Sequence, residues 1–160
     1  MKYIVARIED WDVVARAIAE RLKPGMVVRL TGPLGAGKTT LVQALARVLG
    51  AKDVPRSPTF SLLRSYVLSA SIRKHPQASA GDNRLRRLVH VDAYRLESAS
   101  DAHALGLDDE LAGGDTVLAV EWPENLGRLL KALPSIDVRI TADSKQEIRR
   151  VEVYGSAREA

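Results

Sequence analysis

The stretch G-P-L-G-A-G-K-T, from Gly32 to Thr39, fits the phosphate-loop pattern G-x-x-x-x-G-K-[ST]. In such a loop, glycines let backbone N–H groups turn toward phosphate oxygens. A lysine in the place of Lys38 reaches the β- and γ-phosphates, and the hydroxyl of Thr39 can bind Mg²⁺. The sequence therefore predicts a nucleotide site whose phosphate-binding residues are Gly32, Gly35, Ala36, Gly37, Lys38, Thr39 and Thr40.

The segments on either side of this loop support the prediction. Residues 26–31 form a mostly apolar run of strand length, as expected of a strand buried on both faces. Residues 40–50 predict a helix that ends at Gly50, and its apolar residues share one stripe: Leu41, Leu45, Val48 and Leu49. Strand, glycine loop and helix thus follow in the required order, and the positive end of the helix dipole points at a bound anion. The alternative is a glycine turn that binds nothing.

Composition limits the remaining possibilities. The chain has 160 residues, of which 46% are hydrophobic and 28% are charged, so we expect one domain with an ordinary core. It contains no cysteine, which excludes disulfides and thiolate metal sites. No apolar run approaches the length of a signal core or a membrane span, so we expect a cytoplasmic protein without a membrane partner. The net charge of +4 is compatible with nucleic acid nearby but does not demonstrate it.

The rest of the chain alternates between strand and helix patterns, which predicts helices layered on a sheet. Further strands are expected at residues 2–8, 60–68, 88–92 and 116–121, and in a closing antiparallel hairpin at 136–141 and 147–154. One helix is expected from Asp10, its N-cap, to about Leu22, with Trp11 in the core. Another is expected at 124–133, with Pro123 in its first turn. Residues 155–160 are expected to form a frayed tail.

Two of the predicted strands end in a carboxylate. Asp92 closes the run 88–92, and Glu121 closes the run 116–121. Ligands of open α/β sheets bind beyond the carboxyl ends of the strands, so acids there are placed to meet Mg²⁺ or its waters. Each acid alone would be an ordinary surface residue, but the phosphate loop favours function. Asp92 and Glu121 are therefore candidate catalytic and metal-binding residues, together with Thr39 and Lys38.

Several other residues keep two interpretations. The loop after the helix at 40–50 contains two prolines, and Thr59 is our candidate for a switch residue that senses the γ-phosphate; the alternative is that Ser57, Pro58 and Thr59 form only a turn. Arg95 is either a finger that neutralises transition-state charge or a member of an ordinary ion pair. The basic residues around the long loop 69–83 face solvent, or they contact an RNA backbone or an acidic partner. No metal binding is expected from His90 or His103.

Four stretches together resemble the TsaE (YjeE) family, the bacterial ATPases required for threonylcarbamoyladenosine synthesis in tRNA. They are L-G-A-G-K-T-T from Leu34 to Thr40, S-P-T-F from Ser57 to Phe60, H-V-D-A-Y-R-L from His90 to Leu96, and E-W-P-E from Glu121 to Glu124. The resemblance covers nearly the whole chain. Two departures stand out: family members usually carry Asp where this chain has Pro33, and loop 69–83 looks longer than usual.

The resemblance implies a single-domain α/β P-loop NTPase fold over residues 1–154, with a mixed, mainly parallel sheet flanked by helices. It implies ATP bound with Mg²⁺ and weak ATPase activity alone. The implied partners are TsaD and TsaB, where TsaD transfers the threonylcarbamoyl group to adenosine 37 of ANN-decoding tRNAs and ATP turnover supports repeated cycles. Whether tRNA contacts this subunit stays open.

Site residues can be carried over by position from the resemblance. Lys38 and Thr39 correspond to the phosphate and metal residues, Asp92 and Glu121 to the acids, and Ser57 and Thr59 to the switch. Trp122 and Glu9 correspond to neighbours of the nucleotide. A P-loop small-molecule kinase and a non-hydrolysing ATP-dependent assembly module are the alternatives. A GTPase is disfavoured, because the sequence has no N-K-x-D guanine-reading motif.

Overall fold

The computed structural model describes residues 1–53, 62–69, 85–96, 106–143 and 147–156. The strands are β1 (Lys2–Val5), β2 (Val27–Thr31), β3 (Leu63–Val67), β4 (Arg87–Asp92), β5 (Thr116–Glu121), β6 (Ser135–Asp143) and β7 (Ile148–Ser156). The helices are α1 (Asp10–Ala19), α2 (Lys38–Val48) and α4 (Leu107–Ala112), and two 3₁₀ segments are η2 (Ala93–Arg95) and η3 (Pro123–Leu130). No helix among these residues is long and apolar enough to span a membrane.

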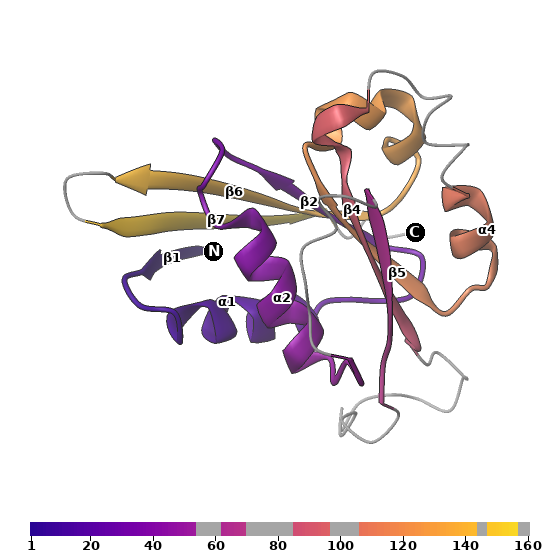
Figure 1. Cartoon of the computed structure of the whole chain (residues 1–160), viewed down its shortest axis with the longest axis horizontal. Coiled ribbons are helices and arrows are strands. Elements are labelled where there is room, and N and C mark those ends of the chain that lie inside the picture. Colours follow the sequence, from indigo (N-terminus) through magenta and orange to yellow (C-terminus); the bar gives the residue numbers. More distant parts are fainter. Residues whose placement is uncertain (54–61, 70–84, 97–105, 144–146, 157–160) are drawn as a thin grey trace.

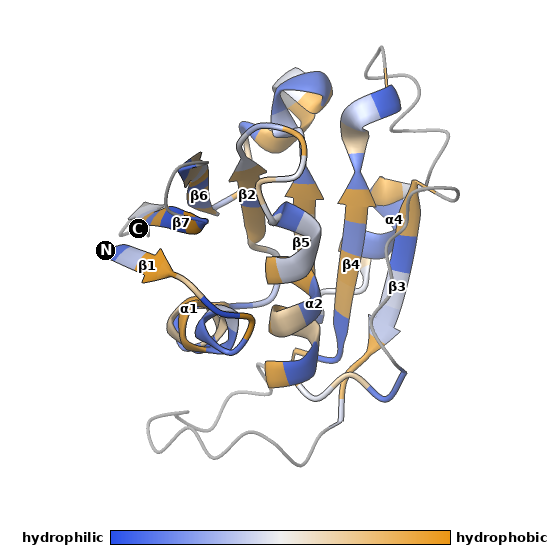
Figure 2. Ribbon diagram, turned by 60° about the vertical axis from the view of Figure 1, so that its left-hand side comes forward, coloured by the Kyte–Doolittle hydropathy of each residue, from blue (hydrophilic) through white to orange (hydrophobic). Residues whose placement is uncertain are grey.

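One mixed sheet contains all seven of these strands, in the order β1-β7-β6-β2-β5-β4-β3. Its four central strands are parallel, because β2 pairs with β6 and β5, and β5 pairs with β4. Antiparallel strands lie at both margins: β7 and β1 beyond β6, and β3 beyond β4. The carboxyl ends of β2, β5 and β4 therefore meet at one edge of the sheet (Figure 2). The mixed α/β fold and the C-terminal hairpin are confirmed.

The sheet is covered on both faces, which explains why its central strands read as continuous apolar runs. Val117 and Ala119 of β5 belong to the core cluster that includes α1 and α2. Leu118 and Val120 belong to a second cluster on the opposite face, with residues of α4 and η3. Figure 1 shows α1 and α2 side by side below the sheet and α4 on its other side. Alternate residues of each central strand thus support different layers.

The start of α1 differs from the expectation. Asp10 is the first helical residue rather than the N-cap, and its carboxylate reaches backward, where Oδ2 accepts hydrogen bonds from the backbone N–H groups of Ala6 and Arg7, each 2.9 Å long. These bonds lower the pKa of Asp10. The prediction was wrong because an acid in this position can satisfy the turn after β1 instead of the helix that follows.

Other boundaries also differ, since the strand expected at 2–8 ends at Val5 and the helix expected to reach about Leu22 ends at Ala19. The helix expected at 124–133 is the 3₁₀ segment η3, which is interrupted at Gly127 (φ 45°, ψ −114°). The strand expected at 60–68 is shorter within the described residues, since β3 begins at Leu63. Gly155 and Ser156 were expected in a frayed tail, but they pair with Ile136 and Ser135 of β6 and belong to β7. The hairpin is therefore longer than the alternating apolar pattern indicates, because β6 pairs with β7 as far as Ser156.

The contact between α1 and the glycine-rich loop is close. Trp11 is 5% exposed, which confirms its place in the core. A Cβ atom on Gly37 would lie 2.5 Å from Cζ2 of Trp11, and Gly37 has a φ of 106°. Both the backbone conformation and the buried indole ring therefore require glycine at this position.

We expect Gly37→Ala to lower the free energy of unfolding by about 2–5 kcal/mol, from about 1–2 for the left-handed backbone and about 1–3 for displacing Trp11. Gly35→Ala is the matched control, because Gly35 also has a positive φ of 75° but nothing lies within 4 Å of its Cβ position. Its loss should stay at about 1–2 kcal/mol. Urea unfolding of both variants measures the difference, and equal losses would contradict the role of the Trp11 contact.

Candidate functional site

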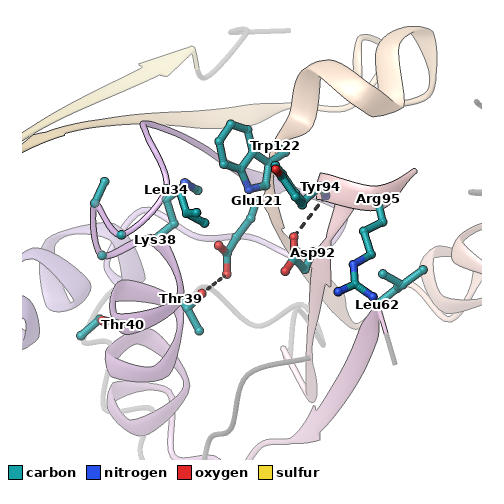
Figure 3. Close-up of a pocket in the computed structure, with 13 residues that line it drawn as sticks. Leu34, Lys38, Thr39, Thr40, Leu62, Asp92, Tyr94, Arg95, Glu121 and Trp122 are labelled. Atoms are coloured by element: carbon teal, nitrogen blue, oxygen red, sulfur yellow. Dashed lines mark hydrogen bonds between the residues drawn. The ribbon is translucent and has the colours of Figure 1, made fainter. Parts of the chain in front are cut away.

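The loop between β2 and α2 borders a cleft of about 370 Å³ at the carboxyl edge of the sheet. Figure 3 shows α2 on one side of this cleft and the ends of β4 and β5 on the other. Gly37 is the N-cap of α2, so the helix directs its first N–H groups and its positive dipole end here. The lining residues are Leu34, Gly35, Ala36, Gly37, Lys38, Thr39, Thr40, Leu62, Asp92, Tyr94, Arg95, Glu121 and Trp122.

Lys38 is a buried cation at the foot of this cleft, 4% exposed. Its Nζ donates hydrogen bonds to the carbonyl oxygens of Gly32 (2.7 Å) and Pro33 (2.9 Å). Burial lowers the pKa of Lys38, and the negative charges of Glu121, Asp92 and Glu124 oppose that shift. An incoming anion would favour the charged form further. The lysine is therefore held by the loop itself and faces a cluster of acids.

Glu121 joins the end of β5 to the first turn of α2. It is 4% exposed, and its Oε1 accepts a hydrogen bond from Oγ1 of Thr39 at 2.7 Å. Nε2 of His90 lies 2.8 Å from the same oxygen. Since the Thr39 hydroxyl proton is directed at Glu121, the lone pairs of Oγ1 remain available to a cation. This arrangement fits a divalent metal bound between a hydroxyl and a carboxylate.

Asp92 stands opposite Glu121 in the parallel register of β4 and β5. Its Oδ1 accepts a hydrogen bond from the backbone N–H of Tyr94 at 3.1 Å, so the carboxylate also caps η2. Figure 3 shows both acids beside the cleft. The pairing of adjacent strand ends thus brings together the two acids that the sequence placed 29 positions apart, from 92 to 121.

Trp122 and Tyr94 form the aromatic wall of the cleft. Their ring centroids are 5.1 Å apart with an interplanar angle of 53°. Nζ of Lys38 lies 4.0 Å from the centroid of the Trp122 ring, within cation–π range. Trp122 has a positive φ of 57°, a conformation that a bulky residue rarely adopts. The backbone strain and the position beside Lys38 place Trp122 in the site rather than in the core alone.

The structure brings most of the predicted site residues together. The loop residues from Gly35 to Thr40, both acids and Trp122 line the cleft, and Gly32 adjoins it through its bond to Lys38. Glu9 is exposed at the start of α1 and does not line the cleft, although Trp11, two residues on, touches Gly37. Ser57 and Thr59 lie outside the described residues. Their roles, like that of Glu9, remain predictions.

Sequence reasoning missed the contact made by His90 and left Arg95 undecided. The sequence predicts no metal binding by His90 and did not indicate its contact with Glu121; the available signal was its position two residues before Asp92, on the same face of the strand. Arg95 lines the cleft, and no described residue forms an ion pair with it. Tyr94 was not predicted from the sequence as a site residue. The 3₁₀ turn that Asp92 caps places Tyr94 at the cleft.

A metal at this site would need ligands from the nucleotide and water. Among the described residues, no three His, Asp or Glu side chains form a cluster able to hold a metal ion on their own. Mg²⁺ commonly binds through one or two carboxylates, with substrate phosphates and water completing its octahedron. The donor set of Thr39, Glu121 and Asp92 fits that pattern.

Known proteins resemble this chain along nearly its whole length. The tRNA threonylcarbamoyladenosine biosynthesis protein TsaE of Streptomyces coelicolor is 37% identical over 145 residues, which cover 89% of this chain and 88% of the relative. Its namesake from Bacillus subtilis is 32% identical over 149 residues, covering 92% and 83%. The crystal structure of Bacillus subtilis YdiB matches with a TM-score of 0.68 at 27% identity, covering 99% of this chain and 87% of that one. Fold and site together define a protein of the P-loop NTPase fold class.

The family assignment narrows this class. The family model described as threonylcarbamoyl adenosine biosynthesis protein TsaE matches residues 5–151. This chain belongs to the TsaE family, as the four resembling stretches predicted.

We expect Thr39→Val to lower the free energy of unfolding of the nucleotide-free protein by about 1.5–3 kcal/mol, because buried Glu121 loses a hydrogen bond to its charge. Thr39→Ser keeps the hydroxyl and should lose less than about 1 kcal/mol. Thr40→Val is the control, since Thr40 lines the same cleft but makes no side-chain hydrogen bond to a described residue. If denaturant unfolding gives the same loss for the two valine variants, the Thr39–Glu121 bond does not stabilise the site.

Proposed function

We propose that this protein is a Mg²⁺-dependent ATPase that supports threonylcarbamoyladenosine synthesis at position 37 of ANN-decoding tRNAs, acting with TsaD and TsaB. Membership of the TsaE family supports the pathway. The observation that carries the ATPase proposal is the cleft itself, where Lys38 faces the Thr39–Glu121 pair at the N-terminus of α2. A cation and two acids around a helix N-terminus suit a bound phosphate chain with its metal.

The loop would bind the phosphates before any chemistry takes place. The N–H groups of the first turn of α2, from Lys38 to Thr40, have no acceptor within the helix and would bind phosphate oxygens, and Lys38 would exchange its bonds to the Gly32 and Pro33 carbonyls for the same ligand. Trp122 and Tyr94 offer flat apolar surface beside this position. Burial of Lys38 strengthens its attraction to the phosphates, because few water molecules screen the charge.

The two acids would have different roles in hydrolysis. Glu121 is tied to Thr39, so both would bind Mg²⁺, which neutralises charge that develops on the phosphates. Asp92 is fixed by the Tyr94 N–H on one oxygen and would orient the attacking water with its carboxylate. The water oxygen forms a bond to the γ-phosphorus while the bond to the β,γ-bridging oxygen breaks, and the water proton leaves through Asp92 to solvent. ADP and inorganic phosphate result.

Hydrolysis would then reset the association with partner proteins. Moving such an equilibrium from mostly bound to mostly free requires about 5.5 kcal/mol of differential affinity, so the nucleotide must touch the partner or reorder a loop that does. Leu34 is 80% exposed and Tyr94 is 56% exposed, and both line the cleft. A partner that covers the cleft would bury these two apolar side chains next to the nucleotide. The Ser57–Thr59 switch is a second route to the same coupling.

We expect Lys38→Ala to lower multiple-turnover tRNA modification by about 100-fold or more in a reaction reconstituted with TsaD and TsaB, because one charged phosphate contact is lost. Lys131→Ala removes an exposed lysine and serves as the control. Circular dichroism confirms that both variants are folded. An undiminished yield with Lys38→Ala would remove the proposed role of ATP turnover.

Glu121→Ala and Asp92→Asn should separate the two acids. We expect Glu121→Ala to weaken the Mg²⁺ dependence of ATP binding, whereas Asp92→Asn should bind Mg-ATP normally and lower kcat by about 100-fold. Calorimetric titration with AMP-PNP, with and without Mg²⁺, measures binding, and phosphate release from γ-labelled ATP with TsaD and TsaB present measures hydrolysis. Normal binding and hydrolysis by Glu121→Ala would show that its assignment is wrong, and transfer of the label to a metabolite would support a kinase instead.

A further inference from the structure

His90 lies completely buried beneath the proposed metal site. It occupies the middle of β4, where Val89 and Val91 pack into the core cluster on the α4 face of the sheet. Leu88 packs into the opposite cluster, with α1 and α2. Since side chains alternate along a strand, His90 points with Leu88 toward α2. Its exposure is 0%, so the imidazole is enclosed between the sheet and the helix that carries Lys38 and Thr39.

The hydrogen bonding of His90 is one-sided. Nε2 lies 2.8 Å from Oε1 of Glu121, whereas Nδ1 has no hydrogen-bond partner among the described residues. Oε1 of Glu121 is the acceptor in this contact, so Nε2 is the donor and carries the hydrogen. A buried N–H group without a partner is rarer than a buried acceptor without one, which favours the tautomer with the hydrogen on Nε2. His90 is thus a donor aimed at a single oxygen.

The Nε2–H group of His90 gives the Glu121 carboxylate a second hydrogen-bond donor, on the side away from the cleft. Oε1 receives the hydroxyl proton of Thr39 at 2.7 Å and the Nε2 proton of His90 at 2.8 Å. No described residue donates to Oε2, which leaves that oxygen for a ligand in the cleft. Two donors on one oxygen fix the rotation of the carboxylate about its last bond. The acid therefore presents the same oxygen and angle to whatever binds above it.

A role in stability alone does not explain this residue. A core histidine kept for packing would have both ring nitrogens paired, and an apolar side chain of similar size would remove the unpaired Nδ1. The position opposite His90 on β5 is Ala119, so the histidine reaches diagonally past a small residue to meet Glu121. The sheet thus accommodates a polar ring that, within the part of the chain the structure describes, forms its one side-chain hydrogen bond with an acid of the site.

We propose that His90 is a positioning residue for Glu121: its Nε2–H orients the carboxylate, and with it the Thr39 hydroxyl, for a divalent cation bound with nucleotide. The proposal rests on the nucleotide-binding function proposed above. Residues that orient metal ligands in this way typically change metal affinity by about 10- to 100-fold when mutated. His90 itself touches neither metal nor nucleotide.

Two nearly isosteric variants test the donor. Gln at position 90 can place an amide N–H near the Nε2 position, whereas Met cannot donate. AMP-PNP affinity is measured by calorimetry in EDTA and in Mg²⁺, and the ratio gives the gain due to the metal. We expect His90→Met to reduce this gain about 10-fold or more with unchanged affinity in EDTA, and His90→Gln to stay within about 3-fold of wild type. An unchanged gain in His90→Met, or equal losses in both variants, would overturn the proposal.

A double-mutant comparison tests whether His90 acts through Glu121. In a Glu121→Ala background, His90→Met should cause no further loss of the Mg²⁺ gain; the same loss as in wild type would contradict the proposal. ¹⁵N-histidine NMR of nucleotide-free protein should show His90 protonated at Nε2, and an Nδ1–H tautomer would also overturn it. The NMR result does not depend on nucleotide. A wild type that binds AMP-PNP with no gain from Mg²⁺ would instead contradict the proposed function.

Discussion

The hydrogen bond from Thr39 to Glu121 joins the first turn of α2 to the end of β5, and the geometry of the site depends on it. The parallel register supplies its framework: β2 places the glycine loop, β5 places Glu121, and β4 places Asp92 opposite Glu121. α2 is pressed onto this edge by the core cluster of Leu41 and Leu45 against the sheet. Packing of apolar residues thus determines where α2 and the strand ends lie, and the Thr39–Glu121 hydrogen bond then fixes the orientation of these two side chains.

The cleft concentrates groups that are costly to bury. Lys38 and Glu121 are each 4% exposed, and the lowered pKa of Lys38 reflects the lost hydration of its charge. Trp122 adds a strained backbone at φ 57°, held by Tyr94 and Asn125, whose backbone N–H bonds the Trp122 carbonyl at 3.1 Å. Such costs are typical of binding sites, where a ligand repays them by pairing the charges.

Local patterns in the sequence predicted most of the fold. Buried parallel strands, a glycine loop and the closing hairpin each carry a signal over a few neighbouring residues, and the strand ends located Asp92 and Glu121. The signal failed where a side chain had two local options, as for Asp10, or where a contact joins distant strands, as for His90. The diagonal contact of His90 with Glu121 across β4 and β5 leaves no pattern in the residues of either strand alone. The positive φ of Trp122 likewise leaves no pattern in its neighbouring residues. These features arise only from strand register and layer packing.

Pro33 contributes to the glycine loop through its backbone carbonyl. This carbonyl accepts hydrogen bonds from Nζ of Lys38 at 2.9 Å and from the backbone N–H of Ala36 at 3.2 Å, so the backbone of the loop helps to orient Lys38. Proline also fixes φ and removes one N–H from the loop. Lys38 is therefore held by neutral carbonyls within the loop, and the negative charges of Glu121, Asp92 and Glu124 oppose the lowering of its pKa by burial. Because Glu121 and Asp92 also face the proposed metal, binding of a cation would weaken their attraction for Lys38 and direct the ammonium group toward the phosphates.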